Sequence, residues 1–151
     1  MPDYFGTGPI TTRPKTLFKH FDNSAKVVSL VNGSGAEMVP GMEVYLSNDG
    51  EVTYRTTGTQ VPIGIITVGG ATAGEMVTVQ IYGKGWVTAI AKGGTLAEGD
   101  LVRQDGTTST NGLPGYVVVA TAGHWVTGIV VFGNTIGLEC QVMVLDTPIK
   151  F

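Results

Sequence analysis

MEVYLSNDGEVTYR, residues 42–55, is the stretch that decides the fold. Met42–Leu46 and Glu51–Arg55 each alternate between apolar and polar side chains, which is the period of a β-strand with one buried face. Asn48-Asp49-Gly50 between them is a turn sequence that suits positive φ angles. The stretch therefore predicts a β-hairpin.

Short apolar or alternating runs of the same kind recur along the chain, separated by turns rich in glycine. The 23 glycines among 151 residues are about twice the usual share of roughly 7%. Helix signals are poor, because Gly99 interrupts the best window, Thr95–Asp100. We therefore expect an all-β fold, a small β-sandwich or a barrel. The further expected strands are Val27–Val31, Ile63–Val68, Met76–Tyr82, Gly85–Ile90, Asp100–Arg103, Tyr116–Val119, Trp125–Phe132 and Leu138–Leu145.

An internal repeat is visible in the order of strands and turns. Gly41–Val44 resembles Gly99–Val102, and Gly64–Ile66 resembles Gly128–Val130. These matches divide a β domain, residues 26–151, into two similar halves at about 36–83 and 94–146.

A competing alignment pairs Ala71–Gly74 with Ala120–Gly123. The two alignments exclude each other. We favour the first, because it keeps the order of strands and turns across each half.

Residues 1–25 differ from the rest of the chain. Three prolines disfavour helix and strand there, yet the segment is rich in large apolar and basic side chains. We expect an extended N-terminal arm that is ordered by binding a partner; the alternative is that it folds back on its own domain. The expected contact residues are Tyr4, Phe5, Ile10, Arg13, Lys15, Leu17, Phe18 and Phe21.

The charge balance argues against nucleic acid as a partner, because the formal net charge is −3 and the basic residues do not cluster strongly. Only 14% of residues are charged, compared with about 25% in an average soluble domain. Part of the surface is therefore expected to be uncharged or covered by a partner. No apolar run of about 18–20 residues and no secretory pattern is present, so we expect synthesis in the cytoplasm and no membrane contact.

Residues with catalytic or metal-binding chemistry are few and scattered. His20 and His124 lie far apart, and Cys140 alternates with valines on one strand face, which predicts a buried thiol. Gly83–Gly85 lacks the spacing of a phosphate-binding loop. We therefore expect no enzyme activity, no metal and no cofactor.

Trp86 and Trp125 have the largest side chains of the sequence, and three roles remain open for them. Either they fill the core, or they lie at a protein interface, or they form a platform for a sugar.

Several segments in the middle of the chain are similar to those of a known family. Val61–Ile65, Gly74–Val79 and Ala91–Val102 resemble the small β-rich capsid cement or decoration proteins of tailed bacteriophages, over about residues 36–106. The resemblance implies a structural virion protein on the outside of a phage capsid. It also implies a homotrimer that bridges neighbouring major capsid proteins. The alternative is a head-fibre or tail-fibre module that binds a host surface glycan through an exposed tryptophan.

Overall fold

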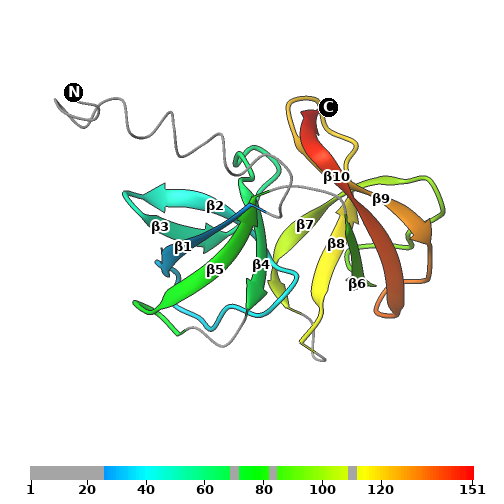
Figure 1. Ribbon diagram of the computed structural model, residues 1–151. Coiled ribbons are helices and arrows are strands. Elements are labelled where there is room, and N and C mark those ends of the chain that lie inside the picture. The colour runs from blue at the N-terminus through cyan, green and yellow to red at the C-terminus, as the bar shows by residue number, and fades with distance from the viewer. Residues whose placement is uncertain (1–25, 69–71, 82–84, 109–111) are drawn as a thin grey trace, which may run out of the picture.

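The computed structural model describes residues 26–68, 72–81, 85–108 and 112–151. The ten elements of these residues are all β-strands, which confirms the all-β prediction. They form two closed five-stranded barrels that lie next to each other (Figure 1). The predicted N-terminal arm lies outside the described residues.

The first barrel contains the predicted hairpin. Its neighbouring strands are in the order β1-β3-β2-β4-β5. β2 and β3 pair antiparallel with Asn48 opposite Glu51, and Gly50 in the turn has φ +70°, as the turn sequence predicts. The strands are β1 (Val27–Asn32), β2 (Glu43–Asn48), β3 (Glu51–Tyr54), β4 (Gly64–Val68) and β5 (Met76–Ile81).

The second barrel repeats this topology with the next five strands. Its order is β10-β6-β8-β7-β9; β6 pairs parallel with β8 as β1 does with β3, and the other pairs are antiparallel. β7 and β10 extend further than the sequence predicts. The strands are β6 (Gly85–Ala91), β7 (Leu101–Thr108), β8 (Pro114–Val118), β9 (Trp125–Phe132) and β10 (Glu139–Lys150).

Matching residues of the two barrels have matching partners. Val44 pairs with Gly64 in the first barrel, and Val102 pairs with Gly128 in the second. These are the residues that the favoured sequence alignment matches. Each barrel also has one strand, β1 or β6, that precedes the aligned segment.

Each barrel has its own hydrophobic core. The first core centres on Met38, Val44 and Val79, and the second on Tyr116 and Cys140 among others. Cys140 is therefore buried, as its alternation with valines predicts, and burial raises the pKa of its thiol. Because the two cores are separate, the contacts at the junction fix how the barrels sit against each other.

Two equivalent glycines are required by close packing inside the barrels. A Cβ at Gly64 would lie 2.3 Å from the carbonyl oxygen of Gln80, and one at Gly128 would lie 2.4 Å from Cγ1 of Val142. We expect Gly64→Ala to destabilise the protein by about 1–3 kcal/mol, as overpacking does, and more than Gly128→Ala, because backbone yields less than a side chain. Urea unfolding of both variants measures this.

Gly94→Ala is the matched control, because a Cβ at Gly94 would have no neighbour within 4 Å. Equal unfolding midpoints for Gly64→Ala and Gly94→Ala would contradict the packing argument.

Candidate functional site

Buried polar side chains gather at the junction between the barrels. Glu43 begins β2 and Arg55 follows β3, so strand pairing places them next to each other, with the Arg55 N–H donating to the Glu43 carbonyl over 3.2 Å. Nη1 of Arg55 lies 2.8 Å from Oε1 of Glu43, and both side chains are 0% exposed. The first barrel therefore presents a buried ion pair to the second.

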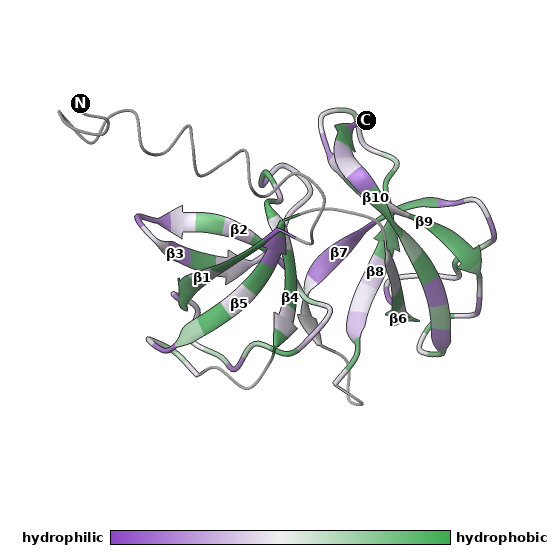
Figure 2. Ribbon diagram, in the orientation of Figure 1, coloured by the Kyte–Doolittle hydropathy of each residue, from purple (hydrophilic) through white to green (hydrophobic). Residues whose placement is uncertain are grey.

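The second barrel supplies hydrogen-bond partners for this region. Thr127 of β9 donates from its hydroxyl to the Glu43 carboxylate. Gln104 of β7 accepts the Glu43 N–H at Oε1 over 2.7 Å and donates from Nε2 to the Gly41 carbonyl. Figure 2 shows the hydrophilic part of β7 beside the first barrel. The barrels are thus joined by a polar clasp, which we define as Glu43, Arg55, Gln104 and Thr127.

The Gly58 carbonyl accepts further hydrogen bonds at the junction. The Trp125 N–H donates to the Gly58 carbonyl over 2.8 Å, and Nη2 of Arg55 donates to the same carbonyl over 3.2 Å. His124 packs so closely that a Cβ on Gly58 would lie 2.1 Å from Nδ1 of His124. His124 therefore lies directly before β9, where the sequence places it, and helps to join the barrels.

Burial carries an electrostatic cost at the clasp. Desolvation raises the pKa of Glu43 above its ordinary value of 4.5, although Arg55 and Thr127 oppose the shift. Nε of Arg55 finds no hydrogen-bond partner within the described part of the chain. A buried ion pair of this kind adds little net stability, because desolvation offsets the Coulomb attraction. We infer that the ion pair serves mainly to fix the orientation of the two barrels.

The same positions are apolar in the second barrel. Leu101 and Val119 stand where the first barrel has Glu43 and Arg55, because the Val119 N–H donates to the Leu101 carbonyl over 2.8 Å in the same pairing. The clasp was not predicted from the sequence. The signal was present, however, in the alignment itself, which sets a charged residue against a leucine.

The clasp does not have the form of an active site. Glu43, Arg55, Gln104 and Thr127 are all buried, so a substrate cannot contact them. A small hollow elsewhere, lined by Lys92, Thr95 and Val118 among others, holds about 180 Å³, below the roughly 300–1,000 Å³ of ligand pockets. Within the described ranges no cluster of three or more His, Cys, Asp or Glu residues is placed to hold a metal.

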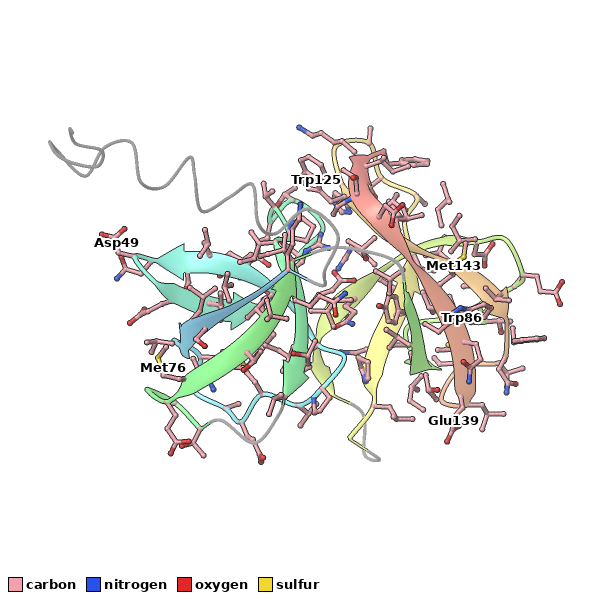
Figure 3. All side chains as sticks on the ribbon, viewed as in Figure 1. Asp49, Met76, Trp86, Trp125, Glu139 and Met143 are labelled. Carbon is pink, nitrogen blue, oxygen red and sulfur yellow. The ribbon has the colours of Figure 1, made fainter. Side chains whose placement is uncertain are left out.

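A row of exposed and half-buried apolar side chains runs across one side of the second barrel. Trp86 of β6 pairs with Met143 of β10, Met143 pairs with Ile129 of β9, and Ile129 pairs with Leu101 of β7. Phe132 at the end of β9 lies two residue pairs further along the ladder, opposite Gln141. We call Trp86, Leu101, Ile129, Phe132 and Met143 the apolar strip. Figure 3 shows Trp86 and Met143 on the same side of β10.

The two tryptophans therefore have different settings. Trp86 is 59% exposed, so the core role is wrong for it and the interface and sugar-platform roles remain. Trp125 is half-buried at the barrel junction. The alternation of β6 is the signal for this difference, because Trp86 and Thr88 share the face opposite to Val87 and Ala89.

The other predicted site residues lie outside the described residues. This holds for His20 and for every proposed contact residue of the arm: Tyr4, Phe5, Ile10, Arg13, Lys15, Leu17, Phe18 and Phe21. None of the described segments forms a helix of the length and hydropathy that a bilayer crossing requires.

Comparison with known proteins gives a structural likeness. No protein-family profile matches the sequence, and no curated protein matches it significantly. The fold is similar to the N base of the head fibre protein gp8.5 of bacteriophage phi29, with a TM-score of 0.52 and 15% identity. The likeness covers 83% of this chain and 100% of the phage chain. The chain thus shares its fold with a phage head fibre base.

We expect substitutions of Glu43 and Arg55 to have strongly coupled effects on the free energy of unfolding. Glu43→Leu leaves Arg55 buried without a counter-charge and is expected to lower the free energy of unfolding by about 3–5 kcal/mol. Adding Arg55→Val recreates the apolar pair of the second barrel and is expected to recover most of that loss. Urea unfolding of the wild type, both single variants and the double variant measures the coupling.

Thr127 keeps the Val102 carbonyl, 3.5 Å away, as a second acceptor in the double variant. A double variant no more stable than Glu43→Leu alone would show that the charge pairing is not what the clasp depends on.

Proposed function

We propose that this chain is a structural protein of a phage head that binds the outside of the capsid and stabilises the lattice of major capsid proteins. The observation that carries the proposal is the two-barrel fold shared with a phage head fibre base over the whole of that base. The resemblance of residues 36–106 to capsid cement proteins points to the same location. On this proposal the protein is made in the host cytoplasm and acts on the virion exterior, without enzyme activity or cofactor.

The architecture suits a binding role. Within the described residues each strand has a neighbour on both sides, so we propose that contacts with other proteins are made mainly by side-chain faces and by the chain ends. A protein that binds only the assembled lattice stabilises it by mass action, and many symmetric copies add avidity. We propose that the copies act as a homo-oligomer, a homotrimer in the simplest case.

The N-terminal arm is the proposed capsid anchor. Residues 1–26 hold four basic and two acidic residues, whereas the remainder holds five basic and ten acidic residues. Its basic side chains, Arg13 and Lys15 among them, suit an acidic capsid patch. Its aromatic side chains supply the apolar contact area.

Deleting residues 1–25 is expected to weaken capsid binding at least tenfold while leaving both barrels folded, because each has its own core. Capsids made without the protein are mixed with the wild type or the deletion variant, and bound copies are counted by electron microscopy. Circular dichroism and urea unfolding verify the fold of the variant.

Lys150→Ala, an exposed residue at the end of β10, is the control for a general loss of positive charge. Normal decoration by the deletion variant would exclude the arm as the anchor.

Glycan binding by a head-fibre or tail-fibre module is the second candidate function. The exposed indole of Trp86 favours it, because sugar rings stack on accessible aromatic faces. Retention of the wild type on host polysaccharide, abolished by Trp86→Ala, would support this function over capsid cementing.

A further inference from the structure

We propose that copies of this chain associate head to tail, with the second barrel of one copy docked on the first barrel of the next. The contact repeats, between chains, the junction that joins the two barrels within a chain. The proposal deepens the proposed function, because it rests on the self-association stated there and assigns the surfaces that bring it about.

The junction inside the chain is formed by two unlike surfaces. The first barrel contributes a docking side, which we define as Gly41 and Glu43. The second barrel contributes a receiving side, which we define as Val87 and Gln104. Gln104 bonds to both residues of the docking side, and a Cβ on Gly41 would lie 3.5 Å from Cγ1 of Val87. Because the two sides differ, the junction uses one side of each barrel and leaves the other side unused.

Strand pairing identifies the unused receiving side, which lies on the first barrel. Leu46 is the fourth residue of β2, as Gln104 is the fourth residue of β7. Val28 pairs with a buried valine of β5, as Val87 pairs with a buried valine of β10. The unused receiving side is therefore formed by Val28 and Leu46.

The unused docking side lies on the second barrel and has the same backbone shape as the used one. Leu101 begins β7 as Glu43 begins β2. The N–H groups of Gly41 and Gly99 each donate over 2.8 Å to a carbonyl of β4 or β9, and the φ angles of these glycines are +91° and +85°. A Cβ on Gly99 would have no neighbour within 4 Å among the described residues. The unused docking side is therefore formed by Gly99 and Leu101.

The unused receiving side is exposed where the used one is covered. Leu46 is 54% exposed, whereas Gln104 is 3% exposed. Val28 is 40% exposed, whereas Val87 is half-buried next to Gly41. Val28 and Leu46 both pair with core residues that are 0% exposed, and paired residues project from the same face of a sheet. The receiving side of the first barrel is therefore an uncovered part of its core face.

The two unused sides match each other in chemistry. In the existing junction the Glu43 carboxylate accepts from the hydroxyl of Thr127, and the Glu43 N–H donates to Gln104. In the unused sides Leu101 stands in place of Glu43, Leu46 in place of the glutamine, and Ile63 in place of the threonine. Polar groups therefore meet polar groups within the chain, and apolar groups meet apolar groups between chains.

This match indicates which barrel occupies the unused receiving side. A first barrel docked there would bury Glu43 against Leu46 and leave its hydrogen bonds unmade, which is costly. A second barrel would bury Leu101 there and would lose no hydrogen bond. Because the second barrel of the same chain is already joined to the first, the occupant is the second barrel of another copy.

A contact between two unlike sides adds copies in one direction until the assembly closes into a ring. In a closed ring each copy docks on one neighbour and receives the other, so no side remains unused. A homotrimer built in this way has three equal contacts between chains.

The test measures the oligomeric state of the full chain without capsids. Sedimentation velocity is recorded from about 1 to 100 μM, which detects dissociation constants of about the same size. The wild type is expected to form an oligomer. Leu46→Lys and Leu101→Lys each alter one side, and each is expected to associate at least about tenfold more weakly, because each places a charge in an apolar contact. Circular dichroism verifies that each variant is folded, and Leu101→Thr takes the place of Leu101→Lys if the latter is unfolded.

An equimolar mixture of the two variants distinguishes a head-to-tail contact from other modes of association. The Leu46→Lys copy retains its docking side, and the Leu101→Lys copy retains its receiving side, so one junction can form in each pair. We expect complexes of two chains that do not grow further, at concentrations where each variant alone is monomeric.

Val68→Lys is the matched control, because it places the same charge on an exposed apolar residue of the first barrel. Val68 is 61% exposed, and Phe132, which has the equivalent place in the second barrel, is 60% exposed and therefore lies outside the existing junction. The control is expected to associate as the wild type does.

Three results overturn the proposal: a wild type that is monomeric throughout, a folded Leu46→Lys variant that associates normally, or a mixture in which the two variants do not pair. A wild type that is monomeric and associates only after deletion of residues 1–25 would show that its own N-terminal segment occupies the receiving side. Because no capsid is present, failure of this proposal is distinct from failure of capsid binding.

Discussion

The buried ion pair between Glu43 and Arg55 is the interaction on which the arrangement of the two barrels depends. The barrels have separate cores, so no continuous apolar packing sets their relative orientation. Thr127 donates to the Glu43 carboxylate and Gln104 accepts the main-chain N–H of Glu43, so directional hydrogen bonds connect the second barrel to the residue that forms the ion pair. We infer that the desolvated pair of charges adds little to the free energy of unfolding and acts mainly by restricting how the two barrels are oriented.

The two barrels share a topology but differ in their surfaces. The first has Glu43 and Arg55 where the second has Leu101 and Val119, and the charged pair lies at the junction between the barrels. Both barrels expose large apolar side chains, Val68 and Met76 in the first and Trp86 and Met143 in the second.

A structural role on a phage head agrees with these features. Burial raises the pKa of Glu43 and of Tyr116, which both lie in the interior, and several large apolar side chains, Trp86 among them, are exposed. The fold is that of a head fibre base, and that likeness concerns the fold alone. Binding to a capsid, anchoring by the N-terminal arm and self-association are proposals, and a separate experiment tests each of them.

The sequence by itself determined the all-β class, the hairpin at residues 42–55 and the regions of all ten strands, because alternation and turn glycines are local properties of the chain. It also matched Gly64 with Gly128. Only the tertiary structure decided which face of β9 is buried, because β9 carries apolar side chains on both faces and alternation cannot distinguish the inside from the outside until the barrel closes. The burial of Glu43 has the same cause, because its face is sealed by residues far along the chain.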